Sequence, residues 1–367
     1  MQFRCSKNEL SKAIAVAGRA IAKVQQTIRD CILFETQDNM VVLKATDGQM
    51  SIRTRVIAQI ETPGRIAVPA RILAEFVSHL PNAEVTMKQI AENTVEVRCE
   101  AAKSRIQLMN ADEFPTLPEV SGTAAVTVPT DQFKDMVSRT AFAVASTEDR
   151  PILTGILFHL GRESLRMVAV DGYRMAICKE PAVCEVDGDY LVPARALREL
   201  CRSLGDEHSD LTICFEGGRA MFRTDFMQVV TPLIEGDYVP YESFFPDTYA
   251  THVGVDRETL CKCVERADII ARQLSSPVIK LTLKEGELDI QADAQTASSS
   301  EPIPVVKHGA DITIALNSRY LLDVLHAVYD PEVTLMFNTP TTPCVVERQG
   351  IESYHYLILP VQIQRAS

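Results

Sequence analysis

Two short motifs recur in this sequence at one spacing, and that repeat limits what the chain can fold into. An Ala-Thr-Asp-Gly segment at 45–48 precedes Val-Pro-Ala-Arg at 68–71, and Ala-Val-Asp-Gly at 169–172 precedes Val-Pro-Ala-Arg at 192–195. Asp47 to Asp171 and Arg71 to Arg195 are both steps of 124 residues. A drifted third copy follows at Gln-Ala-Asp 291–293 and Asn-Ser-Arg 317–319. Two unrelated motifs that share one offset predict a duplicated unit, here present three times.

The 367 residues divide naturally into three such units. Proline-containing stretches at 110–123 and 235–251 are typical of connectors between units. We therefore predict three domains, at residues 1–122, 123–250 and 251–367, each near the usual domain size.

Composition indicates a soluble, cytoplasmic protein. Hydrophobic residues make up 46% of the chain, yet no run approaches the length of a membrane span, and the first ten residues do not resemble a signal peptide. The closest of the ten cysteines, Cys261 and Cys263, are separated by one residue, which is not a zinc-ligand spacing. Buried, reduced thiols are the expected state, with no metal and no cofactor.

Each copy is predicted to contain a helix, short strands, a second helix and further strands. Ser6 and Glu9 have the spacing of a capping box, and the first helix should run to about Lys23 with Leu10, Ile14, Ala17 and Ile21 on its inner face. The equivalent helices begin near Thr130 and at Asp256, and a proline in the first turn opens each Val-Pro-Ala-Arg helix. Because strands and helices do not alternate, the class is α+β with antiparallel sheets.

Charge is distributed unevenly along the chain. The formal net charge is −12, but residues 1–29 contain six basic residues and one acidic residue. Lys12, Arg19 and Lys23 fall on the outer face of the first helix, where a solvated surface helix would usually mix lysine with glutamate. The stripe is compatible both with a surface that faces an anion and with an ordinary solvated face.

The order of these motifs across three copies, with Leu-Ile-Leu-Pro-Val at 357–361, resembles the bacterial sliding clamp family, the β subunit of DNA polymerase III. The resemblance covers the whole chain. It implies three tandem clamp domains, each with two helices packed on antiparallel sheets, and two chains that close head to tail into a ring. In that family helices line a central channel, so the ring encircles duplex DNA without regard to sequence and keeps a polymerase near its template.

The resemblance also assigns site residues. Candidates for the DNA channel are basic residues on the predicted helices: Lys12, Arg19, Lys23, Arg71, Arg139, Arg195, Arg198, Arg202, Lys262 and Arg266. Candidates for the dimer interface are Arg105, Ile106, Leu108, Ile269 and Ile270. A pocket for a short linear motif of partner proteins would use Leu153, Val170, Gly172, Tyr173, Arg174, Met175, Pro240, Asn317, Tyr320, Pro343, Ile358, Leu359, Pro360 and Val361. Leu274 is placed near that pocket only by approximate alignment, and the acidic pair Glu148-Asp149 departs from a basic channel.

The implied partners are double-stranded DNA, a second copy of the chain, the polymerase III catalytic subunit, the clamp loader and other proteins that carry the motif, with no membrane. Two other functions have less support in the sequence. An enzyme would need a phosphate loop or a nucleophile motif, and the Asp-Gly segments are explained by turn conformation. A peptide-binding scaffold that does not encircle DNA is opposed by the basic helix near the amino terminus.

Overall fold

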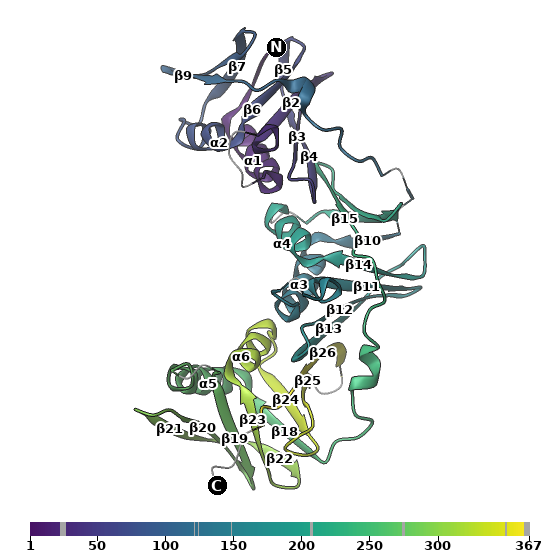
Figure 1. The fold of residues 1–367 in the computed structure, drawn as a ribbon, viewed down its shortest axis with the longest axis vertical. Helices are drawn as coiled ribbons and strands as arrows, with labels where there is room; N and C mark the ends of the chain where they lie inside the picture. Colours follow the sequence, from purple (N-terminus) through teal and green to yellow (C-terminus); the bar gives the residue numbers. More distant parts are fainter. Residues whose placement is uncertain are drawn as a thin grey trace. The chain divides into compact units, whose positions relative to one another are not determined.

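The computed structural model describes residues 1–22, 27–120, 122–123, 125–147, 149–205, 208–273, 276–348 and 351–362. Its contacts divide the chain into two compact units, which we treat separately (Figure 1). Unit 1 contains Met1–Phe133 and Arg195–Leu233, and unit 2 contains Lys134–Ala194 and Ile234–Ser367. Sequence copy two therefore contributes to both units.

Six α-helices, two in each sequence copy, occur among the described residues. They are α1 (Lys7–Ala17), α2 (Ala70–Ser78), α3 (Thr130–Thr140), α4 (Ala194–Ser203), α5 (Arg257–Ala271) and α6 (Ser318–Ala327). No helix in the described part of the chain is both long enough and apolar enough to span a membrane.

Within the described ranges the strands form four sheets in which all pairs are antiparallel, as the α+β prediction requires. In unit 1 a five-stranded sheet has the order β5 (Gln59–Thr62), β1 (Gln2–Ser6), β7 (Glu84–Ala91), β8 (Thr94–Cys99) and β9 (Ala102–Gln107). The eight-stranded sheet of unit 1 has the order β10 (Val126–Pro129), β15 (Asp210–Glu216), β16 (Arg219–Arg223), β17 (Met227–Pro232), β4 (Ser51–Ile57), β3 (Met40–Thr46), β2 (Cys31–Gln37) and β6 (Arg65–Pro69).

Unit 2 holds the other two sheets. The nine-stranded sheet has the order β14 (Gly188–Pro193), β11 (Gly155–Gly161), β12 (Ser164–Val170), β13 (Arg174–Pro181), β26 (Ile351–Ile358), β25 (Cys344–Arg348), β24 (Glu332–Phe337), β18 (Thr251–Asp256) and β22 (Val306–Gly309). The four-stranded sheet has the order β21 (Ser298–Pro304), β20 (Glu287–Asp293), β19 (Val278–Lys284) and β23 (Ile312–Asn317).

The helix starts predicted near Thr130 and at Asp256 are confirmed, whereas the details predicted at Ser6 and Pro69 were wrong. Ser6 makes no side-chain cap; instead the Lys7 amide donates to the Ala83 carbonyl at 3.1 Å, which satisfies one free amide of that first turn. Pro69 lies one position before α2 rather than within its first turn. Asp256 does cap α5, because its side chain accepts from the Thr259 amide at 2.8 Å.

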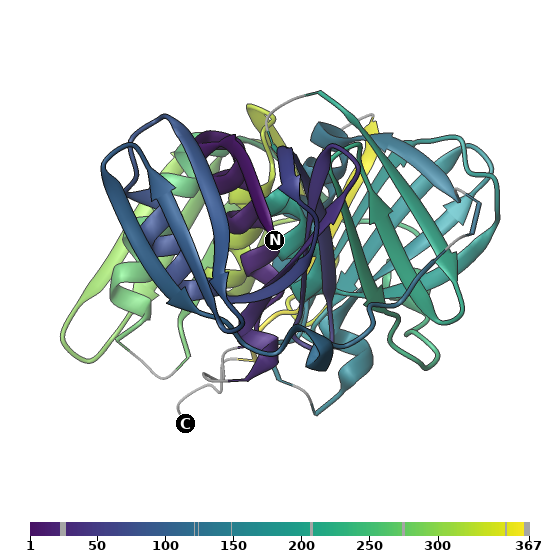
Figure 2. The ribbon, with the colours of Figure 1, turned by 90° about the horizontal axis from the view of Figure 1, so that it is seen from above.

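The first helix is also shorter than predicted. It ends at Ala17, followed by a 3-10 turn at Gly18–Ala20, and Lys23 lies outside the described residues. The predicted inner face is otherwise confirmed, since Leu10, Ile14 and Ala17 are buried. This helix packs on β3 and β4 and beside α2 (Figure 2).

Both Asp-Gly segments form the turns that their sequence predicts. Gly48 and Gly172 have φ of 90° and 91°, a region that favours glycine. In each turn the aspartate Oδ1 accepts two backbone amides that follow it; for Asp171 these are the Tyr173 amide at 2.8 Å and the Arg174 amide at 2.9 Å. The turns therefore fix the start of the strand that comes next.

Candidate functional site

An apolar cluster in unit 2 lies where sequence copies two and three share one sheet. The cluster contains Leu153, Val170 and Met175 from copy two with Val345 and Leu357 from copy three, all no more than 6% exposed. Pairing of β13 with β26 brings the two copies together, with Met175 opposite Leu357 and Arg174 opposite Ile358. Three of the predicted pocket residues thus belong to one buried apolar cluster.

Two large apolar side chains remain exposed beside this cluster. Tyr173 is 62% exposed and Leu359 is 40% exposed. The Leu359 amide donates to the Tyr173 carbonyl at 2.9 Å, and the rings of Tyr173 and Tyr320 stack with centroids 6.2 Å apart. Burial, followed by the charge of Asp171, raises the pKa of Tyr320 above its usual value. These side chains offer apolar area that the chain itself does not cover.

Arg174 holds this arrangement together through contacts in several directions. Its Nε donates to Asp171 at 3.0 Å, its Nη2 donates to the Phe142 carbonyl at 2.7 Å, and its Nη1 pairs with Asp323. The guanidinium also lies over the Tyr320 ring, 4.5 Å from the centroid. Only 10% of the side chain is exposed, so Arg174 orients Tyr320 rather than offering a free charge.

The remaining predicted pocket residues lie on segments that border the same region. Asn317 caps α6 by accepting the Arg319 amide at 3.0 Å, and the Val361 amide donates to the Ala315 carbonyl at 2.8 Å. Pro240 is exposed and Pro343 is half-buried, each directly preceding a residue of the apolar cluster or of β25. Gly172 forms the tip of the turn, and Ile358 and Pro360 flank Leu359. Leu274 lies outside the described residues.

Sequence reasoning did not identify Phe142 and Asp323, the two further contacts of Arg174. A signal for Asp323 was present, because it follows Glu199 by 124 residues. Glu199 accepts from Arg19 at 3.2 Å in unit 1, just as Asp323 pairs with Arg174 in unit 2. The equivalent acidic residues in copies two and three therefore each form an ion pair with an arginine of the preceding copy.

Most of the basic residues predicted for the DNA channel are paired with nearby acids. Arg19 and Arg202 both contact Glu199, Lys12 lies 3.7 Å from Glu9, and Arg71 has no acidic partner among the described residues. Further pairs are Arg195 with Asp47, Lys262 with Glu258, and Arg266 with Glu301. Arg198 is exposed on α4, and desolvation of its guanidinium together with the charge of Arg202 lowers its pKa.

Among the channel candidates that the structure describes, Arg139 has the least exposed side chain. Its side chain is 16% exposed, its Nε lies 2.9 Å from an Asp135 oxygen, and its guanidinium lies over the rings of Tyr329 and Tyr354. This environment resembles a structural ion pair, so Arg139 is the least suited of the described candidates to contact a phosphate.

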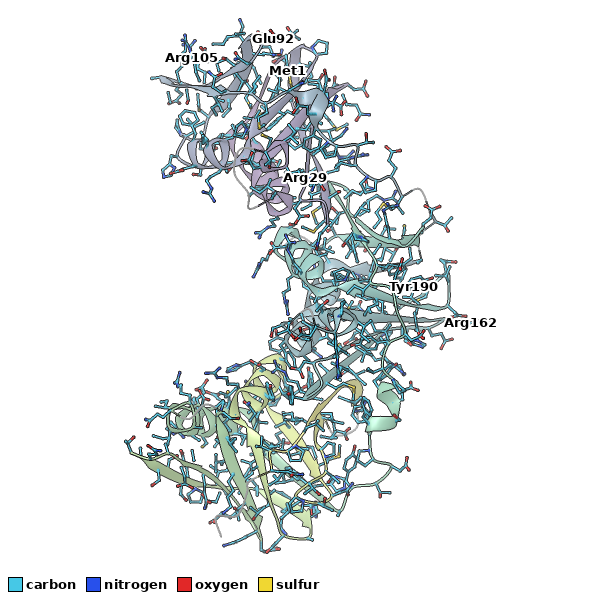
Figure 3. The ribbon with its side chains drawn as sticks, viewed as in Figure 1. Met1, Arg29, Glu92, Arg105, Arg162 and Tyr190 are labelled. Atoms are coloured by element: carbon cyan, nitrogen blue, oxygen red, sulfur yellow. The ribbon has the colours of Figure 1, made fainter. Side chains whose placement is uncertain are left out.

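The five residues predicted for the dimer interface are placed in different environments. Arg105 is 65% exposed at the periphery of the sheet that contains β9, where Figure 3 labels it. Ile269 is 53% exposed on α5, and Leu108 and Ile270 are half-buried. Ile106, at 4% exposure, faces the core of its own sheet opposite Val95.

Three repeats of paired helices on antiparallel sheets, joined by strands that cross from one repeat to the next, define a clamp-type repeat protein. Sequence models of the N-terminal, central and C-terminal domains of the DNA polymerase III beta subunit match residues 1–118, 127–240 and 242–362. The chain belongs to this family, the bacterial sliding clamps.

Relatives and solved structures agree along the full length. A beta sliding clamp of Synechococcus elongatus is 29% identical over 99% of this chain and 100% of its own, and that of Bacillus subtilis is 26% identical with the same coverage. The crystal structure of the Bacillus subtilis sliding clamp matches with a TM-score of 0.94 at 26% identity, covering 99% of this chain and 100% of that one. A Thermotoga maritima beta subunit matches with a TM-score of 0.93 at 26% identity and the same coverage.

Proposed function

We propose that this sliding clamp encircles duplex DNA as a head-to-tail homodimer and tethers the polymerase III catalytic subunit, the clamp loader and other motif-bearing proteins through the Tyr173 region. The action is topological rather than catalytic, takes place in the cytoplasm, and uses three clamp domains at 1–122, 123–250 and 251–367. The observation that carries the proposal is a strand-pairing pattern that the chain satisfies twice and leaves incomplete once.

The last strand of a copy pairs with a strand of the copy before it. In unit 1, β17, the last strand of copy two, pairs with β4, the strand that follows the Asp-Gly turn of copy one. In unit 2, β26, the last strand of copy three, pairs with β13, the equivalent strand of copy two. Each junction therefore extends one sheet across two copies.

Two strands have the same positions in the repeat but lack this partner. They are β9, the last strand of copy one, and β21, the strand after the corresponding turn of copy three. Both lie at an edge of their sheet. An exposed edge is a template for pairing with another chain. If β9 of one protomer pairs with β21 of another, the five-stranded and four-stranded sheets form a sheet of nine strands, as at the junction of copies two and three.

The burial of Ile106 is compatible with that arrangement. At the junction inside unit 1, Val229 of β17 pairs with Ile52 of β4 and is itself fully buried in the sheet. By repeat position Thr231 is the counterpart of Ile106, since the Leu108 and Leu233 amides donate to the equivalent Asn93 and Gly218 carbonyls, and Thr231 is also buried. A junction strand can therefore keep its apolar side chains in its own core while its backbone edge pairs with the neighbour.

Basic residues of the helices would supply weak contacts to DNA phosphates. The side chains of Lys12, Arg202 and Lys262 are 59–73% exposed, and their ion pairs are the kind that contribute little in water. They can therefore exchange a carboxylate for a phosphate at little cost. The net charge of −12 opposes tight binding elsewhere on the surface.

The apolar rim around Tyr173 suits a short flexible peptide. Tyr173, Tyr320 and Leu359 present partly exposed apolar side chains that are held by backbone and ring contacts before a ligand arrives. A preformed rim reduces the ordering cost of binding, and a few anchoring side chains can then supply most of the affinity.

The test uses the full-length protein loaded on nicked circular DNA. A clamp should remain with the circle during gel filtration and be released when the circle is cut, because a ring can slide off an end. A protein that runs as a monomer at micromolar concentration, or that leaves both forms equally, would contradict encirclement and favour the scaffold alternative.

The peptide site needs a separate test. Leu359→Ala should lower the affinity for a clamp-binding peptide about tenfold, since one exposed anchor worth about 1.4 kcal/mol is removed. Leu359 is 40% exposed, so the melting temperature should change little. Val183→Ala, at a side chain 76% exposed and outside the rim, is the matched control. Unchanged affinity in Leu359→Ala would refute the site.

A further inference from the structure

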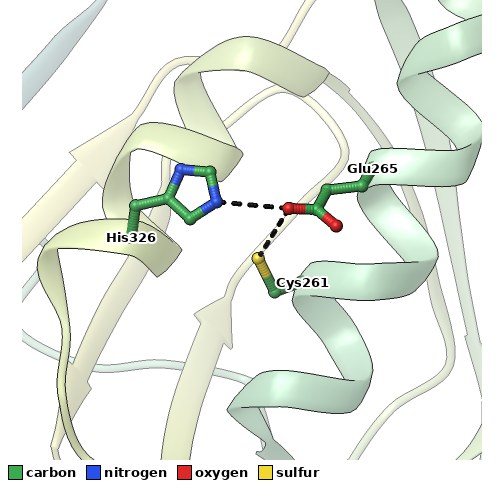
Figure 4. Close-up of side chains that lie close together, drawn as sticks. All are labelled: Cys261, Glu265 and His326. Carbon is green, nitrogen blue, oxygen red and sulfur yellow. Dashed lines mark hydrogen bonds and ion pairs between the residues drawn. The ribbon is translucent and has the colours of Figure 1, made fainter.

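Three side chains of different metal-binding types meet between the two helices of copy three. Cys261 and Glu265 lie one turn apart on α5, and His326 lies in the last turn of α6 (Figure 4). The Cys261 Sγ is 3.8 Å from Glu265 Oε1, and His326 Nε2 is 3.4 Å from the same oxygen. All three donor atoms lie within 4.8 Å of one another. Within the described part of the chain no other such group of three was found.

These separations are close to those of ligands around one tetrahedral ion. With Zn–S near 2.3 Å and Zn–N or Zn–O near 2.0–2.2 Å, two ligand atoms are about 3.3–3.6 Å apart. The two distances to the glutamate oxygen, 3.8 and 3.4 Å, already lie near that range. A small rotation of exposed side chains would complete the geometry.

The helices that carry the donors are fixed to each other on both sides of the group. Near the carboxyl end of α6, Arg257 donates to the Leu325 carbonyl at 3.3 Å and to the Asp330 carbonyl at 3.1 Å. At the opposite end Ser318 Oγ donates to the buried Asp268 carboxylate at 2.6 Å. Backbone positions of the three donors are therefore preorganised, which favours metal binding over rearrangement.

We propose that Cys261, Glu265 and His326 form a binding site for a divalent transition metal ion of the Zn²⁺ type. A thiolate and an imidazole favour Zn²⁺ or Co²⁺ over Mg²⁺ or Ca²⁺, which prefer oxygen ligands alone. Binding forms the S–metal bond as the thiol proton leaves to solvent, while His326 binds as the neutral imidazole. The fourth position is left for water.

One donor of the proposed site is buried and two are exposed, which suits an ion that arrives from solvent. Cys261 is 7% exposed, whereas the side chains of Glu265 and His326 are 51% and 56% exposed. The ion would enter past the two exposed groups and reach the thiol last. Nothing in this arrangement depends on ring closure or on the peptide site, so the site can be tested independently of the proposed function.

The experiment titrates Zn²⁺ into the chelator-treated full-length protein in competition with a chromophoric chelator. One ion per chain is expected, and Co²⁺ should give a thiolate-to-cobalt charge-transfer band. Cys261→Ser, Glu265→Gln and His326→Gln should each weaken binding about tenfold or more, because loss of even a residue that only hydrogen-bonds a metal ligand typically lowers metal affinity by at least that factor. Glu265 and His326 are half exposed, so those two variants should keep the fold.

Two controls separate this site from other thiols and histidines. Cys263→Ser removes a buried thiol that lies 3.2 Å from Glu301 but next to the Arg266 guanidinium, which repels cations. His355→Gln removes a histidine paired with Glu347 at 3.0 Å without a nearby thiol ligand. Both should bind Zn²⁺ as wild type does. No saturable binding, no charge-transfer band, or equal weakening by the controls would overturn the proposal.

Discussion

At the scale of single residues, Arg174 shows why an arginine and not a lysine suits the rim of the proposed peptide site. One planar guanidinium reaches Asp171, the Phe142 carbonyl and Asp323 while it stacks on Tyr320. An ammonium group can supply the charge but not several donors in fixed directions. The residue therefore links the Asp-Gly turn of copy two to α6 of copy three.

Replacing this arginine should affect both stability and peptide affinity. Arg174→Ala leaves Asp171 nearly buried without its cation, so the free energy of unfolding should fall by about 3 kcal/mol. Arg174→Lys should recover part of the stability but little of the affinity, because Tyr320 loses its stacking partner. Arg162→Ala is the control, since Arg162 and its partner Asp187 are 91% and 63% exposed; it should cost less than about 1 kcal/mol. Chemical denaturation and peptide titration measure the two effects.

Asp47 makes stability depend on pH. Burial by itself raises the pKa of this carboxyl, but the amides of Met50 and Gln49 and the Arg195 guanidinium outweigh it and hold the pKa below the ordinary 3.8. A lowered folded-state pKa contributes stability above pH 3.8 that is lost as the pH falls through the folded-state value. Thermal unfolding should therefore show a steeper loss below pH 3.8 in wild type than in Asp47→Asn. Parallel curves would contradict this role.

Glu75 occupies the position in copy one that Glu199 and Asp323 occupy in copies two and three. Each of those two acidic residues forms an ion pair with an arginine of the preceding copy. Glu75 has no basic partner among the described residues. In a head-to-tail dimer its partner would come from copy three of the other protomer. Glu75→Ala should weaken dimerisation about two- to fivefold, as expected for loss of about 0.5–1 kcal/mol. Glu92→Ala, on a loop away from α2, should leave the dimer unchanged in sedimentation equilibrium.

At the scale of elements, the repeat predicted the order of helices and strands because hydrophobic periodicity and turn residues are local signals. The repeat could not predict which copy the last strand of each copy pairs with. The hydrophobic pattern of β17 is the same whether it pairs within its own copy or with β4. The stacking of Arg139 on Tyr329 and Tyr354 could not be predicted for a related reason, because it depends on tertiary packing. The Cys261 and His326 pair likewise meets only through helix packing.

The edge of β9 allows backbone pairing to be tested apart from side chains. The Leu108 amide donates inward to Asn93, so by alternation the Arg105 amide points away from β8. Arg105→Pro removes that outward donor while leaving the β8 ladder intact, and proline is tolerated on edge strands. The dimer dissociation constant should rise about tenfold, as for loss of about 1.4 kcal/mol. Arg105→Ala keeps the amide and should have a smaller effect in sedimentation; equal effects would assign the contact to the side chain alone.

At the scale of the whole molecule, the proposed ring would separate retention on DNA from affinity for DNA. Contacts from residues such as Lys12 and Lys262 need only be weak, because a closed ring leaves a duplex only at an end or by opening. An acidic chain with a few exposed basic side chains fits that division. The net charge of −12 would limit adhesion to DNA, and closure of the proposed ring would supply persistence.

Salt should therefore act differently on the two properties. With about three phosphates neutralised at a time, affinity for a short linear duplex should fall about 40-fold between roughly 50 and 200 mM salt. Clamps already loaded on nicked circles should show no comparable loss, because retention depends on the dimer junctions and not on the phosphates. Arg105→Pro should leave circles faster at both salt concentrations, since opening is then limited by the weakened β9 junction. If retention of the wild-type protein on circles followed the same steep salt dependence as linear binding, electrostatic contact and not encirclement would hold it on DNA.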